Sequence, residues 1–109
     1  RLAADAPLVA GANLGLVVSL ARDGAPVTDL EPFLGAMGHL IIVSADREHF
    51  VHSHPLEHRG RRDRGPDVRF QCRFPAGGVY RAWAQFQHAG KVLTVPFTLA
   101  VAASDAATR

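Results

Sequence analysis

Four of the six histidines of this chain, and its single methionine, lie within the nineteen residues from Met37 to Pro55. Imidazole is a common protein ligand for copper and zinc, and a methionine thioether favours the softer Cu(I) ion. These side chains can bind one ion only if the backbone brings them together. The apolar runs before and after residue 46 are typical of the two arms of a β-hairpin, which is one way to do so.

The register of this hairpin predicts which histidines meet. If the turn is centred on residues 46 and 47, residues whose numbers sum to 93 face each other, so His39 lies opposite His54. Side chains two apart on a strand share a face, which places His52 beside His54. Opposite Cβ atoms are about 5 Å apart, which is close enough for imidazoles to bind one ion. We therefore predict a metal site of His39, His52 and His54, with Met37 as a further ligand.

The ligand set favours copper, as Cu(I) or Cu(II), over zinc. Three imidazoles with one thioether suit copper, whereas zinc sites more often include a carboxylate or a thiolate. Zinc is the alternative, with Glu31, Glu57 or water as its fourth ligand. Another alternative is that the histidines only form hydrogen bonds with backbone or water. A register shifted by one residue would move His39 to the other face and leave His52 and His54 as a smaller site.

The single cysteine, Cys72, cannot form a disulfide within the chain. Val68, Phe70 and Phe74 share its side of the predicted strand, so we expect Cys72 to be buried and slow to react. A blue-copper site needs a thiolate ligand, and Cys72 has no histidine near it in the sequence. We therefore do not expect an electron-transfer site of that type.

Short apolar stretches separated by turn residues predict an all-β fold, and no segment shows a sustained period of 3.6 residues. The clearest hairpin is closed by Ala89 and Gly90, so that residues whose numbers sum to 179 face each other. Pro96 cannot donate a backbone hydrogen bond, which predicts an edge strand or a bulge there. The predicted core includes Phe70, Phe74, Tyr80, Ala82, Phe86, Val95 and Phe97.

Length and composition indicate one domain. The 109 residues are 48% hydrophobic and 20% charged, and we predict a single antiparallel β-sandwich of about seven strands over residues 8–102, flanked by tails at 1–7 and 103–109. No apolar run approaches the ~20 residues of a membrane span, and no secretory signal pattern is visible. The net charge of +2 depends largely on arginines in residues 59–64, a run without aromatic residues, so we expect a solvated loop and no nucleic-acid binding.

Four stretches resemble a group of exported bacterial β-sandwich domains: residues 30–39 (LEPFLGAMGH), 50–55 (FVHSHP), 74–80 (FPAGGVY) and 83–86 (WAQF). The Met-Gly-His and His-x-His-Pro elements are the most specific parts of a resemblance that covers most of residues 8–100. It implies an immunoglobulin-like or cupredoxin-like fold, a periplasmic or otherwise exported location, and an association with copper and heavy-metal handling. The chain departs from the group at Arg47, where glycine is usual in the turn.

Together these observations predict a non-enzymatic copper-binding domain of the bacterial cell envelope that serves in metal buffering, delivery or sensing. Its partners would be the metal ion and a protein in metal transfer. One alternative is a cupin-like metalloenzyme, because His52, His54 and Glu57 partly match the first cupin motif, although Tyr80 stands where the second needs histidine. Another is a metal-free sandwich that binds a protein through a sheet edge. Whether Trp83 covers the metal site is left open.

Overall fold

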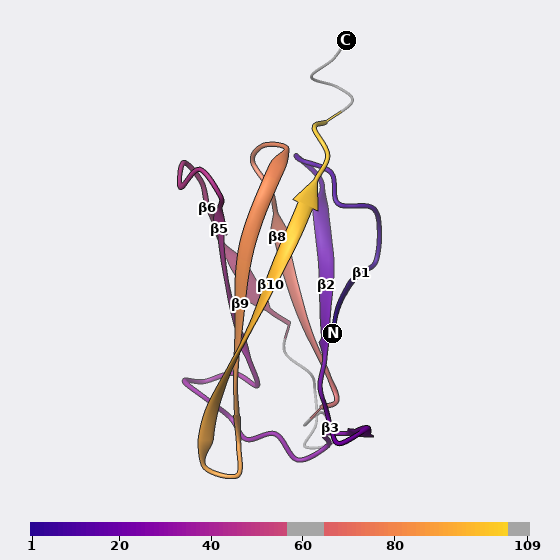
Figure 1. The fold of residues 1–109 in the computed structure, drawn as a ribbon, viewed down its shortest axis with the longest axis vertical. Helices are drawn as coiled ribbons and strands as arrows, with labels where there is room; N and C mark the ends of the chain where they lie inside the picture. Colours follow the sequence, from indigo (N-terminus) through magenta and orange to yellow (C-terminus); the bar gives the residue numbers. More distant parts are fainter. Residues whose placement is uncertain (57–64, 105–109) are drawn as a thin grey trace.

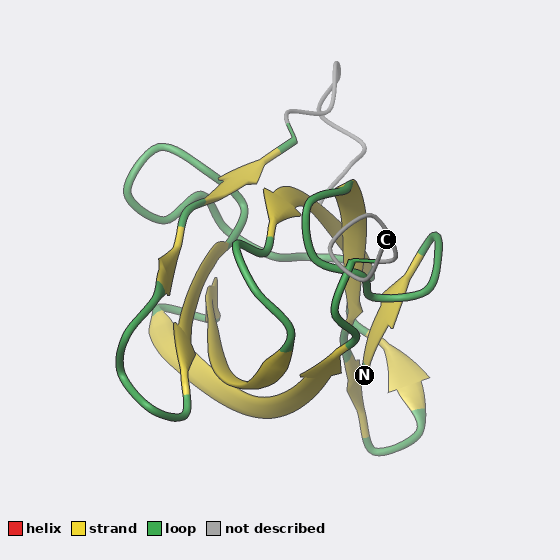
Figure 2. Ribbon diagram, turned by 90° about the horizontal axis from the view of Figure 1, so that it is seen from above, coloured by secondary structure: helices red, strands yellow, loops and turns green. Residues whose placement is uncertain are grey.

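The computed structural model describes residues 1–56 and 65–104, which form strands, turns and loops but no helix (Figures 1 and 2). The predicted all-β fold is thus confirmed, with ten strands in place of about seven. None of the described residues belongs to a helix long and apolar enough to cross a membrane. The strands are β1 (Leu2–Ala4), β2 (Asn13–Ser19), β3 (Ala21–Arg22), β4 (Ala25–Pro26), β5 (His39–Ser44), β6 (Phe50–Val51), β7 (Ser53–Pro55), β8 (Asp67–Arg73), β9 (Gly78–His88) and β10 (Lys91–Val101).

Two four-stranded antiparallel sheets enclose the core. The first sheet has the order β1-β2-β8-β7, and the second has the order β10-β9-β5-β6. Alternate residues of β2 and β8 are buried, as are those of β5 and β9, which is the pattern of strands with one face toward the core. The first sheet begins earlier than the predicted boundary at residue 8, because Leu2 pairs with Val18.

The C-terminal hairpin has the predicted register. Phe86 pairs with Leu93 and every pair along β9 and β10 sums to 179. Ala89 and Gly90 both have positive φ angles, 50° and 77°, as a two-residue turn of the mirror-image type requires. Strand β10 is at the edge of its sheet, in agreement with the position of Pro96.

The core is largely the predicted one, with an exception at the edge. Phe70, Phe74, Tyr80, Ala82 and Phe86 are buried, but the expected core residues Val95 and Phe97 are only partly buried. They lie on the edge strand β10, where fewer neighbours cover the inner face. A hollow of about 410 Å³ that includes Leu30, Leu93 and Val95 in its lining lies beside this strand.

Two local features fix how β5 and β9 enter the sandwich. The Tyr80 hydroxyl donates to the carbonyl of Ala76 (2.7 Å), an arrangement typical of immunoglobulin-like sandwiches. Gly38, directly before β5, packs against aromatic rings: a Cβ atom there would lie 2.5 Å from Phe86 Cε1 and 3.2 Å from Phe70 Cζ. Only glycine fits this approach without displacing the rings, and it sets the position of His39.

Candidate functional site

The hairpin that carries the histidines changes sheet at His52. Strands β5 and β6 have the predicted register, with Ile42 opposite Val51 and Val43 opposite Phe50. The ladder then ends, because the next strand, β7, pairs with β8 in the first sheet. His52 is therefore the one residue between β6, in the second sheet, and β7, in the first.

Ser53 holds this crossing in place. It lies opposite Cys72 in the first sheet, and its hydroxyl donates to the carbonyl of Leu40 on β5, in the second sheet. A polar side chain at this inward position is satisfied by a backbone carbonyl, so the bond ties the two sheets together at their edge. The backbone on either side of Ser53 is fixed as a result.

His52 and His54 flank Ser53 and lie together at the surface. Both are exposed, and their ring centroids are 4.3 Å apart with the ring planes at 76°. Neither ring forms a hydrogen bond or ion pair with another described residue. Within residues 1–56 and 65–104, the ring nitrogens of both residues are thus without a partner and exposed to solvent.

The predicted pairing of His39 with His54 is wrong. His39 lies opposite Gln85 in the second sheet, whereas His54 lies opposite Gln71 in the first. The Nε2 atom of His39 is 2.6 Å from the carbonyl oxygen of Phe33, and the two rings meet edge to face at 5.5 Å. His39 therefore has a structural role at the start of β5.

Met37 does not join the histidine pair either. It is partly buried and packs against the hydrophobic core. Over residues 1–56 and 65–104, no three or more histidine, cysteine, aspartate or glutamate side chains form a group that could hold a metal ion. Of the four predicted ligands, the described structure brings together His52 and His54 only.

The pair lies on a pocket of about 480 Å³, here called the histidine pocket. Its polar lining residues are Asn13, His52, His54, Gln71 and Arg73, and its other lining residues are Phe50, Val51, Cys72 and Pro75. No carboxylate is among these described lining residues. The sequence-based prediction missed Asn13, Gln71 and Arg73, since alternation along their strands indicates only that they face outward, and their approach to the histidines depends on β7 pairing with β8.

Cys72 is buried, as predicted, and its thiol keeps its proton at neutral pH. Burial raises the pKa of Cys72 from 9.0 to about 11, with a further contribution from the negative charge of Asp5. Metals and electrophiles react with the thiolate form of cysteine, so the protonated thiol of Cys72 is a poor metal ligand and a poor nucleophile. The side chain of Cys72 therefore forms part of the pocket wall and does not add a third ligand to the histidine pair.

A separate set of hydrogen bonds shapes the turn between β5 and β6. Asp46 Oδ1 accepts from the Ser44 hydroxyl (2.6 Å) and from the backbone amide of Glu48 (2.9 Å), which lowers the pKa of Asp46. Arg47 has a positive φ of 63°, a backbone conformation that glycine adopts at lower cost than other residues. The amide of His49 donates to the Ser44 hydroxyl. These residues stabilise the hairpin end and do not line the histidine pocket.

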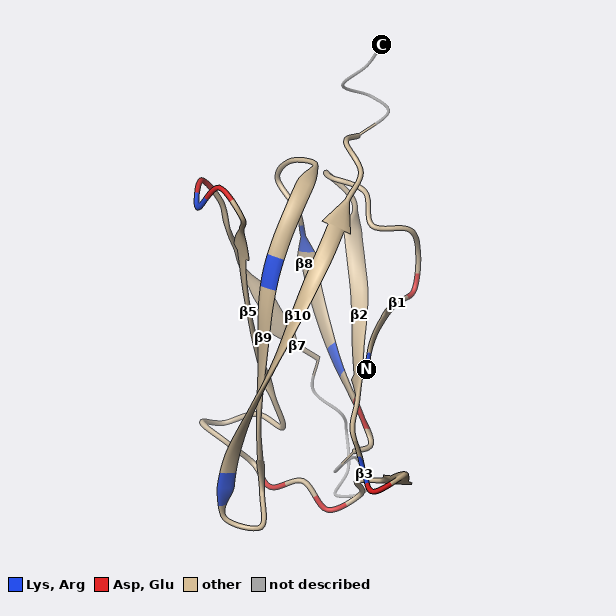
Figure 3. Ribbon diagram, viewed as in Figure 1, with Lys and Arg blue, Asp and Glu red and all other residues tan. Residues whose placement is uncertain are grey.

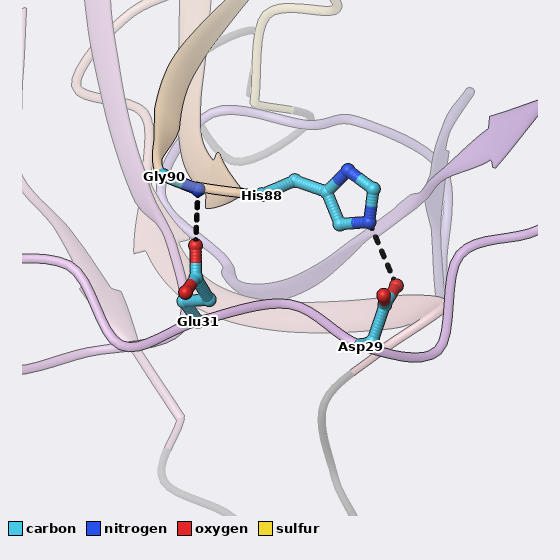
Figure 4. A network of polar contacts seen from close by, with 4 residues as sticks. All are labelled: Asp29, Glu31, His88 and Gly90. Carbon is cyan, nitrogen blue, oxygen red and sulfur yellow. Dashed lines mark hydrogen bonds and ion pairs between the residues drawn. The ribbon is translucent and has the colours of Figure 1, made fainter.

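The carboxylate of Glu31 is also used elsewhere. It accepts from the backbone amide of Gly90 (2.7 Å), and its neighbour Asp29 pairs with His88 at 2.7 Å (Figure 4). These contacts fasten the segment before β5 to the tip of the β9–β10 hairpin. Glu31 is therefore not a zinc ligand beside the histidine pair, while Glu57 and the arginines of 59–64 lie outside the described residues.

Two further residues named from the sequence, Tyr80 and Trp83, do not line the histidine pocket. Tyr80 is buried with its hydroxyl bonded to Ala76, so it does not occupy the place of a cupin ligand. Trp83 lies between Ile41 and Pro96 in the second sheet and is absent from the lining of the histidine pocket.

Comparison with known proteins identifies the family of the chain. No curated protein matches it. A family described as a domain of unknown function (DUF8832) matches residues 1–103, which include all ten strands and the histidine pocket. The chain belongs to this family.

Proposed function

We propose that the chain is a non-enzymatic copper-binding domain of the bacterial cell envelope, for metal buffering, delivery or sensing. The observation that carries the proposal is the exposed pair of imidazoles, 4.3 Å apart and held at the sheet crossing by Ser53. Copper accepts imidazole nitrogen readily, and Cu(II) fills its remaining positions with nitrogen or oxygen ligands from solvent or other molecules. The envelope location rests on the resemblance of the His-x-His-Pro and Met-Gly-His elements.

The proposed ligands are His52 and His54. His39 and Met37 are left out because the first is bonded to Phe33 and the second packs on the core. Structural zinc sites usually have four protein ligands and catalytic ones three, so a pair suits zinc less well. A site with two protein ligands leaves positions open, which suits a domain that passes its ion to another molecule.

The test is a competition titration of the untagged, metal-free chain with Cu(II) against a chelator. We expect one tightly bound equivalent, and at least roughly tenfold weaker binding, about 1.4 kcal/mol, in His52→Ala and in His54→Ala. His39→Ala is the matched control, and its affinity should equal that of the parent. Unchanged copper binding in a double variant that lacks both His52 and His54 would refute the proposal.

A second candidate function is protein binding by the free edge of β10. This strand has eleven residues, and Val92 and Leu93 near its start are 48% and 43% exposed. An open strand edge can pair with a strand of another chain. Pro96 interrupts the edge, which is why we rank this function below copper binding. Binding of a partner by the metal-free double variant would favour it.

A further inference from the structure

The wall of the histidine pocket carries hydrogen-bond donors from two neighbouring strands. Asn13 on β2 lies opposite Arg73 on β8, and Gln71, two residues earlier on β8, lies opposite His54. Residues two apart on a strand, and residues directly opposite on the next, share a face, so these three side chains lie on the same face of the sheet as His54. Figure 3 shows arginines of β8 as blue bands along the strand.

None of these donors has a partner of its own in the described part of the chain. The Arg73 guanidinium forms no ion pair with residues 1–56 or 65–104. The side-chain amides of Asn13 and Gln71 form no hydrogen bond with these residues either. Asp5, on the other side of Gly15, accepts from that glycine's backbone amide (3.1 Å) and does not line the pocket. The pocket therefore offers a permanent positive charge and two side-chain amides, and no carboxylate is among its described lining residues.

The positive charge of Arg73 affects how strongly a copper ion binds in the histidine pocket. A copper ion held by His52 and His54 alone would share the pocket with the positive charge of Arg73, which weakens binding. A carboxylate removes the conflict, since one oxygen can bind copper while the planar group accepts from a guanidinium. The volume of about 480 Å³ lies in the range of small-molecule sites.

We propose that the histidine pocket binds copper together with a small free carboxylic acid, in its ionised form, as a ternary complex. His52 and His54 hold the ion, and Arg73 holds the carboxylate with the amides of Asn13 and Gln71 beside it. This inference rests on the proposed copper binding and adds the class of the second ligand. No bond within the acid breaks, and no electron is transferred.

The probe is oxalate, a planar acid that can chelate copper through one edge and present its other oxygens to the arginine. The chain with one equivalent of Cu(II) is titrated with oxalate, and the copper electron paramagnetic resonance spectrum is followed. We expect a distinct spectrum of the ternary complex before the copper is lost to oxalate in solution. Arg73→Gln should need roughly tenfold more oxalate to form it.

The matched control is Arg69→Gln. Arg69 is an exposed arginine on the same face of β8, but it does not line the pocket. The Arg69→Gln variant should form the ternary complex at the same oxalate concentration as the parent. Equal oxalate dependence in the parent and Arg73→Gln would overturn the inference, while copper binding through the histidines would stand. Absence of copper binding before oxalate is added would instead refute the proposed function.

The source of the carboxylate is tested with a second probe, an aspartate blocked at both backbone ends, which imitates a protein side chain. We expect oxalate to form the ternary complex at concentrations where the blocked aspartate does not, because only oxalate chelates. If both probes form the ternary complex at the same concentration, the second ligand is not a free acid, and the carboxylate is assigned to a side chain of a docking protein.

Discussion

Raising the pH should weaken the fold through Cys72. Its thiol has a pKa of about 11 in the folded chain, against 9.0 for an exposed thiol. Between these pH values the unfolded chain loses this proton while the folded chain keeps it, so the unfolded state binds fewer protons. The free energy of unfolding must then fall as the pH rises from about 9 to about 11. Below pH 9 this contribution is fully present.

The size of the effect follows from the difference between the two pKa values. Each pKa unit corresponds to about 1.36 kcal/mol, so two units set a ceiling of about 2.7 kcal/mol. Cys72 borders the open histidine pocket, where water screens charge. We therefore expect a loss of about 1 to 2 kcal/mol between pH 8 and pH 11.

The assay is urea unfolding of the metal-free chain with reductant present, at pH values from 8 to 11. Other groups also titrate in this range, so the parent is compared with Cys72→Ala, in which every other titration remains. The small cavity left by the substitution lowers stability by the same amount at each pH. The difference between the two curves should shrink as the pH rises. Parallel curves would show that burial of Cys72 does not perturb its thiol.

Three substitutions test other contacts by urea unfolding at neutral pH. Gly38→Ala should cost about 1 to 3 kcal/mol because its Cβ would overlap the Phe86 ring, and a loss below about 0.5 kcal/mol would contradict this packing. Tyr80→Phe should cost about 1 to 2 kcal/mol, since it leaves the Ala76 carbonyl without its donor; stability equal to the parent would count against that bond. Ser53→Ala should cost about 1 kcal/mol and also weaken copper binding, and an unchanged copper affinity would mean that the crossing does not position the imidazoles.

The register of the C-terminal hairpin could be predicted from the sequence because it depends only on residues close together in the chain. A two-residue turn of Ala89 and Gly90 determines the register, and alternation along β9 then assigns Tyr80 and Phe86 to the core. The same reasoning failed farther from a turn. The β5–β6 register was correct as far as Val51, but its extension to His54 assumed that the ladder continued.

The cause of that failure is a contact distant in sequence. Whether the chain stays in one sheet after Val51 depends on the hydrogen bond of Ser53 to Leu40 and on its pairing with Cys72. The hydrophobic periodicity of the sequence does not reveal such long-range contacts. The polar wall of the pocket was missed for the same reason, since Arg73 reaches the histidines only through the pairing of β7 with β8. Adjacent placement of His52 and His54 was predictable, because it needs only the alternation of side chains along a short extended segment.

The edge that carries the histidines is built from short strands with few paired residues. Strand β6 has two residues and β7 has three, whereas β9 and β10 have eleven each. Short outer strands open locally at a much lower free energy than the whole domain unfolds. If copper binds there, local opening of this edge gives an acceptor protein a second way to take the ion, beside direct exchange at the exposed imidazoles, at a rate independent of global unfolding.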